Sequence, residues 1–99
     1  MKINIESIHF DADQKLIDHV ETKAMKLKQY FDRIIDVTVS MKMVNVGKIK
    51  EKYVEVRTKV PGNLLISKES DKTFEIAAEK AFDIMKRNVV KHKNLVTQH

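Results

Sequence analysis

The residues of this sequence whose types and spacing could do chemistry are mostly basic. The last sixteen residues, IMKRNVVKHKNLVTQH, contain no aspartate or glutamate, and the last carboxylate before them is Asp83. Four cations fall in this stretch, namely Lys86, Arg87, Lys91 and Lys93. Cations stabilise the C-terminal end of a helix dipole, by about 0.3–1 kcal/mol each. They also bind the phosphates of a nucleic acid. Stabilisation of the helix dipole does not by itself require that acids be absent. The sequence leaves both interpretations, a helix end and a phosphate-binding surface, open.

A second set of basic and aromatic side chains falls at steps of three, four and seven in the first predicted helix and just beyond it. Its members are Lys15, His19, Lys23, Lys26, Tyr30 and Arg33. Asp18, Glu21 and Asp32 lie in the same segment and favour an ordinary solvated face. If both helices cover the same side of a sheet, the two basic sets can merge into one surface. Such a surface suits an RNA backbone, whereas few aromatic residues are interleaved for base stacking.

Hydrophobic periodicity predicts the elements that must position these cations. Apolar residues alternate with polar ones over 2–8, 34–43 and 49–60, which indicates strands, and a fourth strand begins at Leu64. Steps of three and four predict an amphipathic helix over 13–31, capped by Asp11 or Asp13. Asp71 or Thr73 can open the last helix. Its expected buried stripe comprises Phe74, Ala77, Ala78, Ala81, Met85 and Val89.

The order of these elements predicts an α+β fold, β-α-β-β-β-α. Turns at Gly47 and at 61–63 make the last three strands antiparallel neighbours. A helix connects the first strand to the second, which favours parallel pairing. Each strand has one polar face, so we expect one side of the four-stranded sheet to be solvated and both helices to cover the other.

Composition excludes several classes of protein. Ninety-nine residues suit a single domain, and the formal charge of +5 favours a polyanionic partner. No cysteine is present, and no apolar run approaches the ~20 residues of a membrane span. No nucleophile motif, glycine-rich phosphate loop or metal-ligand spacing can be found, so we expect no enzyme, metal or cofactor. The four histidines, His9, His19, His92 and His99, are expected at the surface or at helix ends.

Three segments together resemble the ribosome hibernation-promoting factors. They are the run Lys26-Leu27-Lys28-Gln29-Tyr30-Phe31-Asp32-Arg33-Ile34, the run Pro61-Gly62-Asn63-Leu64-Leu65, and the ending Lys91-His92-Lys93. The predicted strand and helix order agrees with that family along the whole chain. One departure is Ile84 after Asp83, where the family often has a lysine.

The resemblance implies a domain similar to double-stranded-RNA-binding domains, and a function. It implies binding to the small ribosomal subunit and its rRNA, occlusion of the channel for mRNA and tRNA, and inhibition of translation in idle, stationary-phase ribosomes. The rRNA contacts that it implies, joined to the stripe geometry, are Lys23, Lys26, Lys28, Arg33, Lys86, Arg87, Lys91 and Lys93.

Other expectations complete this hypothesis. Residues 1–99 are expected to form one ribosome-binding domain, and since the sequence ends at His99 we expect no second domain that pairs ribosomes. The protein is expected to be cytoplasmic and monomeric when free, without a membrane or small-molecule partner. Two alternatives stay open: a free-standing duplex-RNA binder, and a regulatory module that binds an acidic protein.

Overall fold

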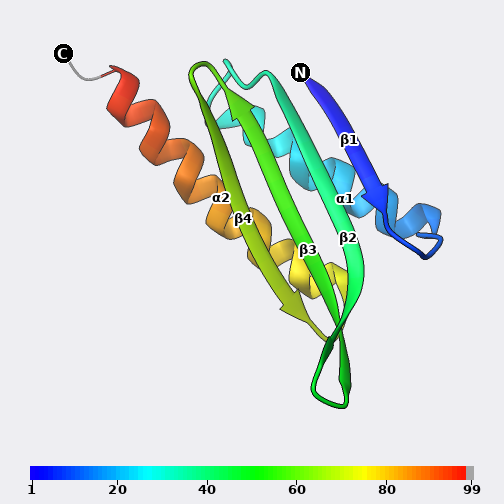
Figure 1. Ribbon diagram of the computed structural model, residues 1–99. Helices are drawn as coiled ribbons and strands as arrows, with labels where there is room; N and C mark the ends of the chain where they lie inside the picture. The colour runs from blue at the N-terminus through cyan, green and yellow to red at the C-terminus, as the bar shows by residue number, and fades with distance from the viewer. Residues whose placement is uncertain (98–99) are drawn as a thin grey trace.

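The fold is a four-stranded sheet with two helices packed against it (Figure 1). A computed structural model describes residues 1–97, so His99 lies outside the described residues. The order β-α-β-β-β-α is the predicted one. The elements are β1 (Lys2–Ser7), α1 (Gln14–Lys26), a short 3-10 helix η1 (Leu27–Gln29), β2 (Asp36–Val46), β3 (Ile49–Val60), β4 (Asn63–Asp71) and α2 (Phe74–Thr97).

The strands lie side by side in sequence order, β1-β2-β3-β4. β1 pairs with β2 in parallel, and the other two pairs are antiparallel, as expected. Gly47 opens the β2–β3 turn with φ 64°, and Gly62 follows Pro61 in the β3–β4 turn with φ 79°. Both values lie in the left-handed region that glycine adopts without steric cost, which explains why the two glycines of the chain stand at these positions.

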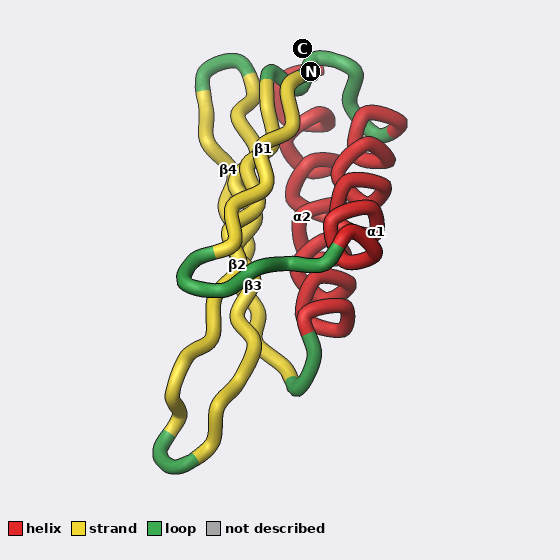
Figure 2. The backbone as a smooth tube through the Cα atoms, turned by 90° about the vertical axis from the view of Figure 1, so that its right-hand side faces the viewer, coloured by secondary structure: helices red, strands yellow, loops and turns green. Residues whose placement is uncertain are grey.

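Both helices cover the same face of the sheet, as Figure 2 shows in edge view. The core lies between the two layers: Val37, Val39 and Met41 of β2 alternate inward and are fully buried. The predicted stripe of α2 is buried throughout, and Phe82 joins it. The Ser67 hydroxyl donates a 2.8 Å hydrogen bond to the Ala81 carbonyl, which ties α2 to β4.

The helix ends are set by side-chain caps. The Asp13 carboxylate accepts a 2.8 Å hydrogen bond from the Leu16 N–H, and the Thr73 hydroxyl accepts a 3.1 Å bond from the Ile76 N–H. Each cap satisfies a backbone donor that has no partner within its helix.

The structure differs from the sequence expectations at three places. The first α-helix ends at Lys26 rather than at 31, because the chain tightens into η1 while Leu27 and Phe31 stay buried. Ile35 is exposed because it precedes β2. The β2–β3 hairpin extends past the helices (Figure 2). Met43 lies in this extension and is exposed, because no helix covers its side chain there.

Candidate nucleic-acid interface

The C-terminal half of α2 presents the predicted cations to solvent. Met85 and Val89 are fully buried and fix the rotation of the helix, so Lys86, Arg87, Lys91 and Lys93 are all exposed. Between residues 1 and 97, no carboxylate lies within ion-pair distance of any of these four cations. Their charges are therefore available to an external anion.

Two surface hollows meet at Lys86. The larger, about 480 Å³, runs along α2 and is lined by Lys86, Arg87, Val90, Lys91, Asn94 and Leu95. The smaller, about 200 Å³, lies between the two helices and is lined by Lys23, Lys26, Leu27, Tyr30, Phe82, Asp83 and Lys86. The Lys86 ammonium stands 4.9 Å from the centroid of the Tyr30 ring, so this cation–π contact holds it between the hollows. The basic sets of both helices thus become one surface, which we call the two-helix surface.

The predicted site residues do not all occupy equivalent places. Five of them line one hollow or the other: Lys23, Lys26, Lys86, Arg87 and Lys91. Lys28 lies in η1, and Arg33 lies in the connection to β2 rather than on the helix. Lys93 is exposed on α2 outside both hollows. Asn94 was not predicted, although its spacing of three from Lys91 was a signal for it.

Acidic side chains divide the two-helix surface. Glu75, Glu79 and Asp83 follow each other at steps of four on α2, and the Lys23 ammonium lies 3.9 Å from the Glu79 carboxylate. A further hollow beside α1 is lined by three lysines, Lys15, Lys23 and Lys26, but also by Asp18 and Glu75. The first half of the surface is therefore nearly balanced in charge, and the excess positive charge lies towards the C-terminal ends of the helices.

Lys80 is neutralised in the same way. Its ammonium pairs with the Asp71 carboxylate. The hydrogen bond from Lys80, aided by one from the Lys72 backbone N–H, lowers the pKa of Asp71, and the same pair raises the pKa of Lys80. Lys80 therefore belongs to the balanced half of α2.

The prediction for His92 was wrong. The side chain is 8% exposed, and its ring lies edge-on to Phe31 with centroids 5.6 Å apart. Its Nε2 atom is buried and has no hydrogen-bond partner among the described residues. His92 continues the buried stripe three residues after Val89, so it anchors the helix between Lys91 and Lys93 instead of lying at the surface.

Other kinds of site find no support in the described residues. Within 1–97 no group of three or more histidine, cysteine or acidic side chains could hold a metal ion. No helix in that range is long and apolar enough to cross a membrane. The described residues thus form a small α+β domain whose helical layer exposes unpaired cations towards the C-terminal ends of its helices.

Comparison with known proteins identifies the family. Residues 3–96 match the family described as Sigma 54 modulation protein / S30EA ribosomal protein, so the chain belongs to that family. It is 31% identical to the ribosome hibernation promoting factor of Pseudomonas putida over 94% of this chain and 87% of that protein. It is 30% identical to the Salmonella typhimurium protein of the same name over 100% of both chains.

A solved structure confirms the fold. The ribosomal subunit interface protein from Coxiella burnetii superposes with a TM-score of 0.82 over 95% of this chain and 99% of that one, at 17% sequence identity. The family match and the two curated relatives confirm the resemblance seen in the sequence. Membership of a family of ribosome-associated factors also confirms the expectation that this protein is not an enzyme.

Proposed function

We propose that this protein is a ribosome hibernation factor that binds the small ribosomal subunit through the two-helix surface. Bound there, it occludes the channel for mRNA and tRNA and inhibits translation in idle ribosomes during stationary phase and stress. The partner is rRNA, and the compartment is accordingly the cytoplasm. The observation that carries the proposal is the acid-free half of α2, whose exposed cations meet those of α1 at Lys86.

Eight cations are proposed to contact rRNA with unequal weight. The five that line the hollows are proposed to hold phosphates, and Lys23 contributes least because Glu79 competes for it. Lys28, Arg33 and Lys93 flank this region and add to its positive field. Phosphate contacts fix position and orientation without reading base sequence. That suits a protein that must find one shaped cleft rather than one sequence.

The charge distribution favours this function over a free-standing duplex-RNA binder. Double-stranded-RNA-binding domains span about 16 base pairs by contacting two minor grooves and the phosphates between them. Such a footprint requires cations along most of the surface, whereas here Glu75, Glu79 and the Lys80–Asp71 pair neutralise the first half of α2. The unpaired cations of the two-helix surface gather at one end of it, and this arrangement suits a cleft in a folded RNA better than the continuous grooves of a duplex.

Co-sedimentation tests the proposal. We expect the protein to sediment with purified small subunits and to be displaced by excess mRNA and tRNA, and we expect it to inhibit translation of a reporter mRNA in a cell-free system. Naked RNA duplexes and nuclease-treated lysate serve as parallel probes. Preference for duplexes, or a partner that survives nuclease, contradicts the proposal. An electron-microscopy reconstruction of the complex then locates the domain and tests the predicted contacts.

A further inference from the structure

The β2–β3 hairpin projects beyond the rest of the molecule. Pairing of β1 with β2 ends at Ser7 and Met41, and pairing of β3 with β4 ends at Lys52 and Asp71. Residues 42–51 therefore form a two-stranded ribbon that neither helix covers, at the opposite end of the molecule from the C-terminal end of α2 (Figures 1 and 2). Lys52 stands at its base, where β3 also pairs with Asp71 of β4. We call residues 42–52 the hairpin arm. An isolated two-stranded hairpin is only marginally stable, so the presence of a ribbon that no other element covers needs an explanation.

Local contacts hold the arm in shape. Gly47 with φ 64° leads a two-residue turn closed by the cross-strand pair Val46 and Ile49. Such β-branched pairs stabilise a hairpin even when exposed. At the base, the Lys42 ammonium lies 5.3 Å from the centroid of the Tyr53 ring. The arm is thus a formed element of the structure.

The charge of the arm is strongly one-sided. It carries four lysines, Lys42, Lys48, Lys50 and Lys52, against the single acid Glu51. None of these lysines lies within ion-pair distance of a carboxylate in residues 1–97. The arm carries a formal charge of +3 and residues 84–97 carry +4, whereas the whole chain carries +5. The rest of the chain is therefore net negative. The protein therefore has two cationic poles, along a longest dimension of 50 Å.

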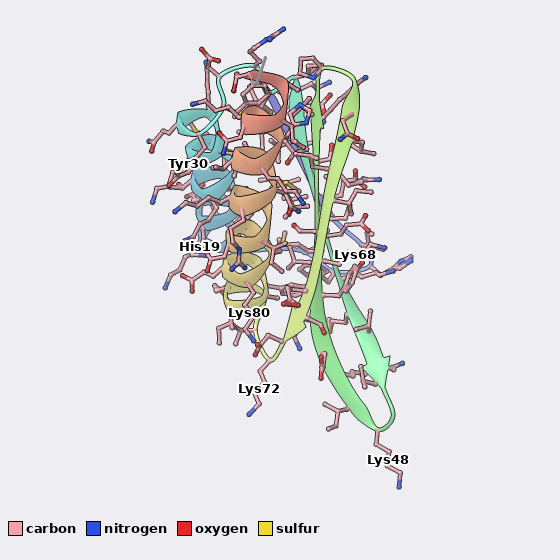
Figure 3. The ribbon with its side chains drawn as sticks, turned by 90° about the vertical axis from the view of Figure 1, so that its left-hand side faces the viewer. His19, Tyr30, Lys48, Lys68, Lys72 and Lys80 are labelled. Atoms are coloured by element: carbon pink, nitrogen blue, oxygen red, sulfur yellow. The ribbon has the colours of Figure 1, made fainter. Side chains whose placement is uncertain are left out.

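Protection against aggregation explains only part of this pattern. Lysines on exposed strands can prevent a strand from pairing with another chain. Val46 and Ile49, 54% and 66% exposed, share the outer face of the ribbon with Lys42, and Met43, 46% exposed, lies opposite Lys52 on the other face. Lys42 and Lys52 therefore do lie beside exposed apolar residues. Lys50 lies opposite Asn45 rather than an apolar residue, and Lys48 extends from the tip of the arm (Figure 3). By alternation from the buried Val54 and Val56, Lys50 and Lys52 are on the face of the sheet that carries the helices.

We propose that the hairpin arm is a second RNA contact, in which Lys48, Lys50 and Lys52 bind the phosphate backbone at a place distinct from that bound by the helices. The inference rests on the proposed function, since the RNA is that of the small subunit. Alternate residues of a strand are about 6.6–6.8 Å apart. That spacing is comparable with the step between successive phosphates, so the two inward lysines can follow one strand of RNA. Two poles at opposite ends of a rigid domain fix its orientation as well as its position.

The test compares two triple variants in which lysines become glutamines. The arm variant is Lys48→Gln, Lys50→Gln, Lys52→Gln, and the matched control is Lys2→Gln, Lys59→Gln, Lys68→Gln, three lysines on the solvent face of the sheet. Binding to small subunits, and to protein-free RNA purified from them, is measured against salt concentration. We expect the arm variant to lose about two to three units of slope in log K against log salt, and about tenfold in affinity or more at 0.1 M salt. We expect the control to lose little. Thermal unfolding verifies that both variants fold.

The outcomes separate the arm from the proposed function. An arm variant with wild-type affinity and slope on both probes overturns the inference and leaves the two-helix surface intact. If the unmodified protein fails to bind small subunits, the proposed function is overturned, and titration of the protein-free RNA decides the arm alone. If the unmodified protein binds neither the small subunits nor the protein-free RNA, both the proposed function and the inference about the arm are overturned.

Cross-linking identifies what the arm touches. The chain has no cysteine, so Lys48→Cys offers a single thiol for a photoactivatable benzophenone. Cross-links to rRNA in the complex with small subunits support the inference. Cross-links only to a ribosomal protein, or none in a complex that does sediment, contradict it.

Discussion

The two halves of α2 expose equal numbers of charged side chains and differ in what surrounds these charges. In the first half, Lys80 pairs with Asp71, and Glu79 pairs with Lys23 of the neighbouring helix. In the second half, Arg87 and Lys91 have no acidic neighbour within ion-pair distance among the described residues. One helix thus has a balanced segment followed by an unbalanced one.

This difference shows that a count of cations is a poor guide to a binding surface. An exposed ion pair contributes little to stability, about 0–1 kcal/mol, but it removes a charge from the field that an approaching polyanion meets. Unpaired cations on a rigid helix keep that charge and also keep its position. We therefore expect substitutions in the two halves to affect RNA binding unequally even where the chemical change is the same.

Charge reversal in the unbalanced half is expected to have the largest effect. Arg87→Glu with Lys91→Glu replaces two of the proposed rRNA contacts by repelling carboxylates, so affinity for small subunits is expected to fall by about 100-fold or more and its salt dependence to flatten. Lys80→Gln in the balanced half is the control and is expected to stay within about threefold of wild type. Equal losses for the two variants, measured by co-sedimentation at several salt concentrations, contradict the comparison.

A carboxylate introduced into the unbalanced half of α2 is expected to neutralise a cation there, as the acids of the first half do. Asn94 is exposed, lines the larger hollow and follows Lys91 by three residues. Asn94→Glu places an acid where it can pair with Lys91, as helical neighbours at this spacing do. We expect about tenfold weaker binding, with stability lowered by no more than about 1 kcal/mol because a carboxylate in the last turn opposes the helix dipole. Asn94→Gln is the matched control, and a loss of the same size with Gln points to a hydrogen bond from Asn94 instead.

The buried imidazole between the two outer lysines gives a smaller and different effect. His92 Nε2 has no partner among the described residues, and replacing an unsatisfied buried polar group by an apolar one is nearly neutral or stabilising. His92→Leu is therefore expected to keep the free energy of unfolding or raise it by about 1 kcal/mol in denaturant titrations, with ribosome affinity unchanged. A variant that folds normally but binds tenfold more weakly indicates that the imidazole contacts the partner in the complex.

Much of the fold follows from local pattern in the sequence. The turns at Gly47 and Gly62 and the order of the strands were predicted, because each depends on a few neighbouring residues. Each helix cap was predicted as one of two residues, and the structure shows Asp13 rather than Asp11 and Thr73 rather than Asp71. Element ends were harder to predict. Leu27 and Phe31 keep the helical spacing of apolar residues, so the pattern alone does not distinguish α-helix from the 3-10 turn that follows Lys26.

The candidate site could be predicted only in part, because the rest depends on relations between elements. The ion pair of Lys23 with Glu79 requires the register of two packed helices. The burial of His92 requires the end of α1 to reach Phe31 beside it. The exposure of Met43, and with it the existence of the hairpin arm, depends on where the helical layer stops. Alternation specifies which face a side chain takes but not whether anything covers that face.

Removal of the acid that restrains Lys23 gives the smallest effect and the most direct test of the balanced half. Glu79→Gln leaves the Lys23 ammonium, now 3.9 Å from that carboxylate, free to meet a phosphate. We expect affinity for small subunits to rise about two- to fivefold, because an exposed pair of this kind is worth at most about 1 kcal/mol. Glu21→Gln, which removes one exposed acid from α1 without breaking an ion pair among the described residues, is the control for net charge. If both variants bind equally well, overall charge governs the association and the pairing of Lys23 does not. If only Glu79→Gln binds more tightly, the neutralised half of α2 lies close enough to the RNA for a freed cation to reach it.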